Sequence, residues 1–182
     1  MGISKEKLKS YPEFNFDSGD QTNLEGSLAI LRTVNWLQRS KFQKIKLIVP
    51  AKNQKGADIL CEKKGQKICL EVKAITKASG GHKNLFLHLQ LYEKIKENIG
   101  NARIQLAKSA ELLKCRITIF ACVFNWIEQS VILLQKDYPD IVDLLEKHGV
   151  GESLTGIDGV LFITKMGEAF LFLNERAKCL DT

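Results

Sequence analysis

The chain has 182 residues, of which 45% are hydrophobic and 26% are charged, and its formal net charge is +6. This length and composition suit one globular domain. No run reaches the roughly 18 apolar residues of a membrane helix, and the first ten residues lack the apolar centre of a signal peptide. The five cysteines form no CxxC pair, which favours reduced thiols. We therefore expect a cytoplasmic protein with no membrane partner.

Residues 1–20 are polar with scattered aromatic side chains, and we interpret them as an N-terminal arm that precedes a single domain over residues 21–182. A well-buried helix is predicted over residues 22–41 from the helical spacing of its apolar residues. The stripe comprises Leu24, Leu28, Leu31 and Val34, and it is widened by Ala29, Ile30, Trp36 and Leu37. At the start of this helix, Thr22 and Glu25 fit a capping box, in which Glu25 reaches back to the N-cap residue.

A strand over residues 44–49 and a β-hairpin over residues 56–76 are expected next. Lys64-Gly65 is the only turn signal between two apolar runs, and glycine tolerates the positive φ of a tight turn. With these two residues as the loop, Lys63 faces Gln66, Glu62 faces Lys67, Leu60 faces Cys69 and Asp58 faces Glu71.

This register sorts the hairpin into two faces. The apolar face would hold Ala57, Ile59, Cys61, Ile68, Leu70 and Val72. The polar face, predicted to be in contact with solvent, places Asp58 opposite Glu71, with Lys73 two residues further on. Opposite Cβ atoms lie about 4.5–5.5 Å apart, so the two carboxylates would repel unless a cation lay between them. Mg²⁺ is the usual ion for such a pair, although a simple surface cluster of charges is an equally economical interpretation.

A Gly-rich basic loop follows at residues 77–83, and it either closes over a ligand or only connects two elements. A long helix over residues 84–114 is predicted from one apolar stripe, and Gln105 lies at the edge of that stripe. Residues 116–124 are almost all apolar and indicate a central strand. A short strand at 131–134, a helix at 139–147 and a final hairpin at 157–173 complete the chain. This order predicts an α/β fold with an α-β-β-β-α-β core, in which helices flank a mixed sheet.

Asp58 followed by Glu71-Val72-Lys73, between a helix that carries Glu25 and a helix that carries Gln105, resembles the PD-(D/E)XK nuclease superfamily. The fold of that superfamily is also called restriction-endonuclease-like. The resemblance covers residues 25–124, and the sequence departs from the motif at Ala57, where the family name places proline.

The resemblance implies a metal-dependent nuclease that hydrolyses phosphodiester bonds, of DNA rather than RNA. Asp58, Glu71 and the carbonyl of Val72 would hold Mg²⁺ or Mn²⁺, and Glu25 would complete the metal site. Lys73 would position or activate the attacking water. Gln105 and Lys108 match polar residues that some members carry on the helix after the motif.

The charge distribution fits a nucleic-acid partner. Residues 41–77 contain ten lysines and three acidic residues, a local excess of 10 − 3 = +7 that surrounds the predicted site. Lys77, His82, Lys83 and Lys108 are the expected nucleic-acid contacts, and a homodimer is a further expectation. Two other functions stay open at this point: a nucleic-acid-binding domain without catalytic activity, and a protein-interaction domain whose charges are incidental.

Overall fold

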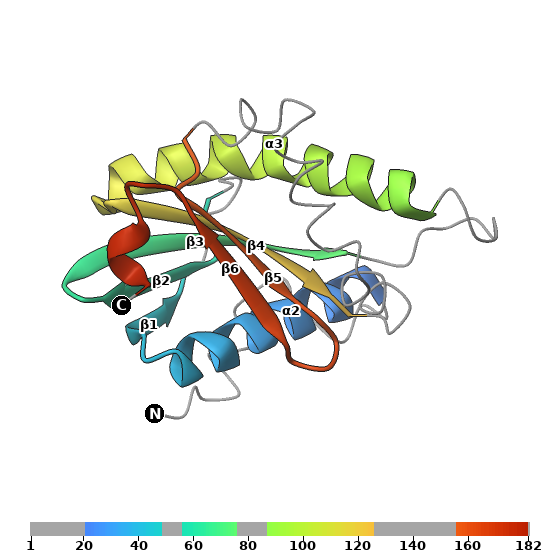
Figure 1. Cartoon of the computed structure of the whole chain (residues 1–182), viewed down its shortest axis with the longest axis horizontal. Coiled ribbons are helices and arrows are strands. Elements are labelled where there is room, and N and C mark those ends of the chain that lie inside the picture. Colours follow the sequence, from blue (N-terminus) through green and yellow to red (C-terminus); the bar gives the residue numbers. More distant parts are fainter. Residues whose placement is uncertain (1–20, 49–55, 76–86, 126–155, 182) are drawn as a thin grey trace.

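The computed structural model describes residues 21–48, 56–75, 87–125 and 156–181. Over these residues the protein is an α/β structure in which one helix lies on each face of a six-stranded mixed sheet (Figure 1). The elements are α2 (Gln21–Arg39), β1 (Gln43–Leu47), β2 (Ile59–Lys63), β3 (Gln66–Ile75), α3 (Leu87–Leu113), β4 (Ile117–Phe124), β5 (Gly159–Ile163), β6 (Ala169–Leu173) and the short 3-10 helix η4 (Lys178–Leu180). The predicted arm, the strand at 131–134 and the helix at 139–147 lie outside the described residues.

The strands lie in the order β1-β2-β3-β4-β5-β6. The first three strands are antiparallel, β3, β4 and β5 are mutually parallel, and β6 returns antiparallel to β5. A parallel pair cannot be joined by a tight turn, and α3 accordingly lies in the connection from β3 to β4. The order of helices and strands from α2 to β4 is therefore the predicted α-β-β-β-α-β.

The register of the β2–β3 hairpin agrees with the prediction. Lys63 pairs with Gln66, Glu62 with Lys67 and Leu60 with Cys69. Lys64 and Gly65 form the turn with φ values of 50° and 72°, so both residues have the positive φ that a two-residue turn of this kind needs. The paired ladder ends at Ile59 and Leu70, and Asp58 lies in a bend just beyond it.

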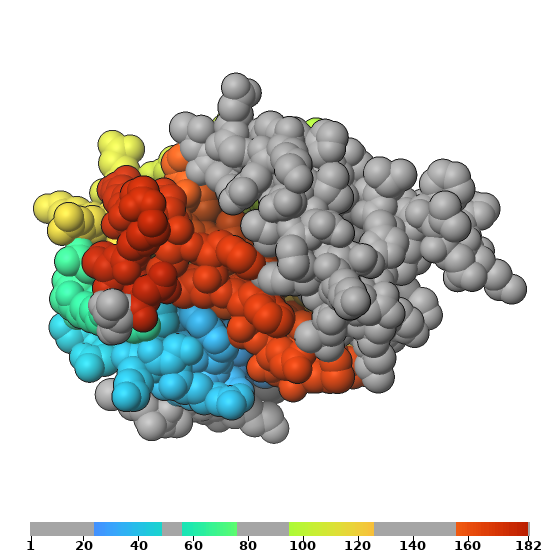
Figure 2. Space-filling model, in the orientation of Figure 1, coloured from blue at the N-terminus to red at the C-terminus, as the bar shows by residue number. Residues whose placement is uncertain are grey.

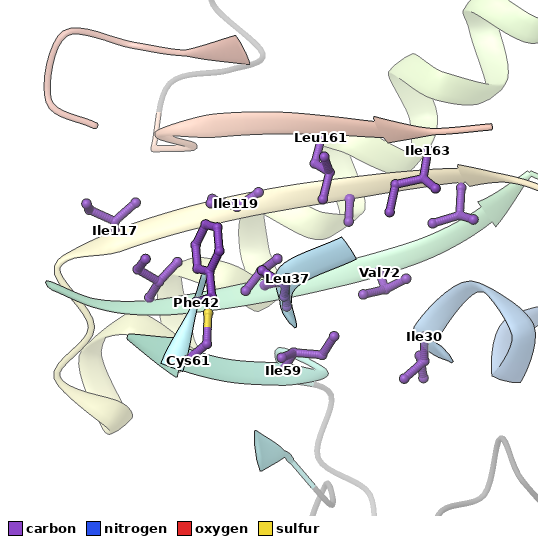
Figure 3. Packing of buried hydrophobic residues seen from close by; sticks show 14 of the residues in the cluster. Ile30, Leu37, Phe42, Ile59, Cys61, Val72, Ile117, Ile119, Leu161 and Ile163 are labelled. Atoms are coloured by element: carbon purple, nitrogen blue, oxygen red, sulfur yellow. The ribbon is translucent and has the colours of Figure 1, made fainter. Parts of the chain in front are cut away.

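The face of the sheet toward α2 is packed with aliphatic side chains, as the close view in Figure 3 shows. Ile30 and Leu37 of α2 join buried residues from four strands there, among them Ile59 of β2, Val72 of β3 and Ile119 of β4. This corrects the prediction for the helix, because Leu24, Leu28 and Leu31 are exposed by 45%, 39% and 45%. The helix carries two apolar stripes, and spacing alone could not decide which one meets the sheet.

The opposite face of the sheet packs against α3. Ile95, Ile99, Ala102 and Leu106 of this helix cover Phe120, Phe124 and Phe162 of the central strands. Ala57 also belongs to this cluster, although the hairpin pattern placed it on the other face. The bend at Asp58 is the physical reason, because it interrupts the alternation of side chains at the point where the chain enters β2.

All five cysteines are free thiols, and Cys61, Cys69 and Cys122 are buried. Burial raises the pKa of Cys61 to about 12, which keeps this thiol protonated at neutral pH. None of the helices that the structure describes is long and apolar enough to cross a membrane. Figure 2 shows the C-terminal hairpin and η4 at the surface, beside the atoms of α2 and β1.

Candidate active site

Glu71 and Lys73 lie on the face of β3 that is turned toward α3. Glu71 is only 1% exposed, because β3 is a central strand and α3 covers this face. The ammonium of Lys73 lies 2.5 Å from Oε1 of Glu71, and the Lys73 side chain is 32% exposed. The expectation of a solvent-exposed polar face was therefore wrong: Glu71 is buried, and only its partner reaches the surface.

Gln105 contacts the same carboxylate from α3. Its amide nitrogen faces Glu71, because an amide oxygen in that position would meet only other acceptors. In this orientation the amide donates hydrogen bonds to both oxygens of Glu71, at 3.2 Å for Oε2. The structure thus brings together Glu71, Lys73 and Gln105, three residues that the sequence predicted for one site.

Asp58 is fixed beside Glu71 by the backbone. Its own N–H donates to the carbonyl of Leu70 at 2.8 Å, and its carbonyl accepts from the N–H of Ile48 at 2.8 Å. Its carboxylate oxygen Oδ2 accepts the N–H of Val72 at 2.7 Å. The Asp58 carboxylate therefore lies against the peptide group that joins Glu71 to Val72.

Ser109 is a component of the site that the sequence did not reveal. Its buried hydroxyl accepts the N–H of Ala57 at 2.7 Å, which ties the entrance of the Asp58 bend to α3. A Cβ at Gly56 would lie 3.1 Å from the same hydroxyl, so this approach is tight. Gln105 and Ser109 are four residues apart and lie on one side of α3. A single helical turn therefore contacts β3 and the residues that lead into β2. A serine within a helix is too ordinary to signal such a role.

Glu25 lies on α2, which packs against the other face of the sheet. The residue is buried, with 6% exposure, and its carbonyl accepts a hydrogen bond of 2.8 Å from the side chain of Asn125, just after β4. Helix α2 begins at Gln21, so Thr22 lies within the first turn rather than at the N-cap. The structure does not gather Glu25 with Asp58 and Glu71 into one group, and its role in metal binding stays a prediction.

The donor atoms at this position suit a hard divalent ion. Asp58 and Glu71 offer carboxylate oxygens and Val72 offers a carbonyl oxygen, the ligand types that Mg²⁺ and Mn²⁺ prefer. Over the described residues, no three side chains of His, Cys, Asp or Glu lie together as a ready-made metal cage. An ion here would therefore be bound by two carboxylates, with water and substrate oxygens completing its shell, as is usual for Mg²⁺.

Of the residues predicted to contact nucleic acid, one lies within the described part of the chain. Lys108 is exposed on α3, three residues after Gln105. Lys77, His82 and Lys83 lie outside the described residues, so their predicted role stays open.

Comparisons of the chain with models of protein families, with curated proteins and with solved structures find no match. The fold and the site define an α/β protein with a mixed sheet, in which a buried carboxylate contacts a lysine and a glutamine. Any function must be argued from these residues.

Proposed function

We propose that the protein is a metal-dependent nuclease with a restriction-endonuclease-like fold, which hydrolyses phosphodiester bonds of nucleic acid, DNA in preference to RNA. One observation carries the proposal: the buried carboxylate of Glu71 contacts Lys73 and Gln105, and the carboxylate of Asp58 accepts the N–H of Val72, the next residue along β3. The α-β-β-β-α-β order of the elements around these residues supports the same conclusion.

A buried charge at this position calls for a functional explanation. Taking a carboxylate out of water costs several kcal/mol, and a nearby cation offsets only part of that cost. An apolar residue would fill a central strand at lower cost, as Leu70 does on the other face of β3. Charged groups that are buried and specifically paired are enriched at catalytic sites.

The residues of the chain divide the chemistry between them. Asp58, Glu71 and the Val72 carbonyl would bind Mg²⁺ or Mn²⁺. When bound, such an ion acts as a Lewis acid on the phosphate and makes a water molecule more acidic. Lys73 reaches the surface and would place its ammonium on the attacking water or on a phosphate oxygen. Gln105 would hold the Glu71 carboxylate in a fixed orientation.

The distribution of charge supports a polyanionic substrate. Segment 41–77 contains ten lysines and three acidic residues, and it includes the strands that carry the site. Clustered lysines bind phosphate backbones without regard to sequence, so this electrostatic attraction favours any nucleic acid.

A cleavage assay with Mg²⁺ or Mn²⁺ tests the proposal. Linear and circular DNA, single-stranded DNA and RNA would be offered to wild-type protein and to the variants Asp58→Asn and Lys73→Ala. We expect cleavage by the wild type and a loss of at least about 100-fold in each variant, since removal of one group that stabilises the transition state costs that much. Lys178→Ala is the matched control, because this lysine is exposed on η4 and pairs only with Glu175 among the residues described.

Three results would contradict the proposal. Activity that persists in both site variants would come from a different site or a contaminant. Binding of nucleic acid without cleavage would favour the non-catalytic binding domain. The absence of both would favour a protein-interaction domain.

A further inference from the structure

Three groups compete for the oxygens of Glu71 if the proposed function holds. The ammonium of Lys73 lies 2.5 Å from Oε1, and the amide of Gln105 donates to both oxygens. A divalent ion would need at least one of these same oxygens. The carboxylate cannot turn toward a different partner, because its side chain is only 2% exposed and α3 packs over it.

We infer that Lys73 and a divalent cation exclude one another at Glu71, so that binding of the cation releases the Lys73 ammonium toward the substrate. This inference rests on the proposed function and specifies how the ion controls the site. Lys73 then pairs with Glu71 until the ion binds. Only afterwards does the Lys73 ammonium act on the phosphate or the water.

The electrostatics favour this exchange. Two cations within hydrogen-bond distance of one carboxylate oxygen repel each other, and the repulsion is strong where water is excluded. Of the groups at the site, Lys73 is the one able to move away. Its side chain is 32% exposed, and its ammonium is carried on a flexible four-carbon stem. Gln105 is neutral, so it can continue to donate to Oε2 of Glu71 while an ion binds on the other side.

The exchange would couple two events that a nuclease needs together. Without a bound ion, the ammonium is held against Glu71 and offsets the charge of a buried carboxylate. With the ion bound, the same ammonium is available to a phosphate near the surface. The lysine would therefore join the reaction only in protein that already holds its metal.

The first test measures the affinity for Ca²⁺ or Mn²⁺ by titration calorimetry in the wild type and in Lys73→Met. Methionine keeps the length of the side chain and removes its charge. We expect the cation to bind roughly tenfold more tightly to the variant, because its competitor is gone. Lys178→Met is the control, and its affinity should equal that of the wild type. Equal or weaker binding by Lys73→Met would overturn the inference.

The second test needs no variant. Wild-type protein is treated briefly with an amine-acetylating reagent, with and without saturating Ca²⁺, and the modified lysines are quantified by mass spectrometry. We expect acetylation of Lys73 to increase at least about threefold with Ca²⁺, while acetylation of Lys178 stays constant. A constant or reduced rate at Lys73 overturns the inference even if Lys73→Met does not fold.

The two levels of failure are distinguishable. If wild-type protein binds neither Ca²⁺ nor Mn²⁺, the proposed metal-dependent function fails. If it binds the ion and Lys73 fails to respond in either test, only the exchange fails.

Discussion

The two faces of β3 solve the problem of burial in different ways. Toward α2 the strand presents Ile68, Leu70 and Val72, which are fully or almost fully buried among aliphatic side chains. Toward α3 it presents Glu71, which is equally inaccessible at 1% exposure, and the partly exposed Lys73. The strand is covered on both sides, so burial alone does not explain its composition. One face stabilises the fold through apolar contacts, and the other accommodates charge by pairing each polar group with a donor or acceptor.

The contrast between the two faces can be tested by substitutions at neighbouring residues of β3. Leu70 and Glu71 are adjacent in sequence and similarly buried, yet they point to opposite sides. If the comparison is right, changes on the α2 face should affect stability, and changes on the α3 face should affect activity far more than stability.

The largest effect is expected for Glu71→Gln. The substitution keeps the shape of the side chain and a hydrogen bond to Gln105, but it removes the charge that a cation and Lys73 require. Cleavage of DNA with Mg²⁺ should fall by about 1,000-fold or more. The free energy of unfolding should change by less than about 1 kcal/mol, because the buried charge is itself removed and Lys73, which is 32% exposed, can turn its ammonium to water. Steady-state kinetics and urea denaturation provide the two measurements. A variant that retains a tenth of the wild-type rate would refute the assignment of Glu71.

Leu70→Ala tests the other face. The substitution leaves a cavity among the side chains against α2, and we expect a loss of about 3 kcal/mol in the free energy of unfolding. The midpoint of urea denaturation measures this loss. The cleavage rate of the protein that is still folded should stay within about twofold of the wild type, because Leu70 touches the site only through its backbone. A free energy of unfolding within about 0.5 kcal/mol of the wild type, roughly the scatter of surface substitutions, would contradict the contrast between the two faces of β3.

The smallest effect is expected for Ser109→Ala. The N–H of Ala57 would lose its acceptor at a buried position, which costs about 1–2 kcal/mol of stability. Asp58 would be held less firmly as well, so the concentration of Mn²⁺ needed for half-maximal binding should rise a few-fold. Calorimetry of unfolding and Mn²⁺ titration give the two values. Glu111→Ala, an exposed substitution on the same helix, is the control for the helix itself. An unchanged Mn²⁺ affinity in Ser109→Ala would reduce Ser109 to a structural residue.

The sequence was most informative where the determinants were local. The turn at Lys64-Gly65 and the alternation around it were sufficient for the hairpin register, because a two-residue loop leaves only one pairing that segregates the apolar residues. The almost wholly apolar run of β4 likewise identified a strand that is buried on both faces.

The misjudged features depended on tertiary packing. Whether Leu24, Leu28 and Leu31 or Ala29, Ile30 and Leu37 face the sheet depends on how α2 docks, and both sets have helical spacing. Similarly, a polar sheet face suggests contact with water, but α3 covers Glu71 with the help of Gln105. Neither packing arrangement is encoded in a short window of sequence.

The site itself was predictable only in part. Asp58, Glu71, Lys73 and Gln105 were identified because their types and order form a pattern, and the structure places them around one carboxylate and its adjoining peptide. Ser109 escaped because its contribution is a single hydrogen bond to a backbone that is 52 residues away. Glu25 remains a prediction, since the pattern that suggested it lies on an element of the opposite face.

The four-residue interval between Gln105 and Ser109 ties both of their contacts to the rotational phase of α3. Each residue inserted into an α-helix turns everything beyond it by about 100°. An insertion between Ala102 and Gln105 would therefore rotate Gln105 and Ser109 relative to Ile95. If the Ile95 side stays against the sheet, the turn that holds Glu71 and Ala57 rotates away from both. The helix can therefore tolerate no insertion at that point without losing both contacts at once.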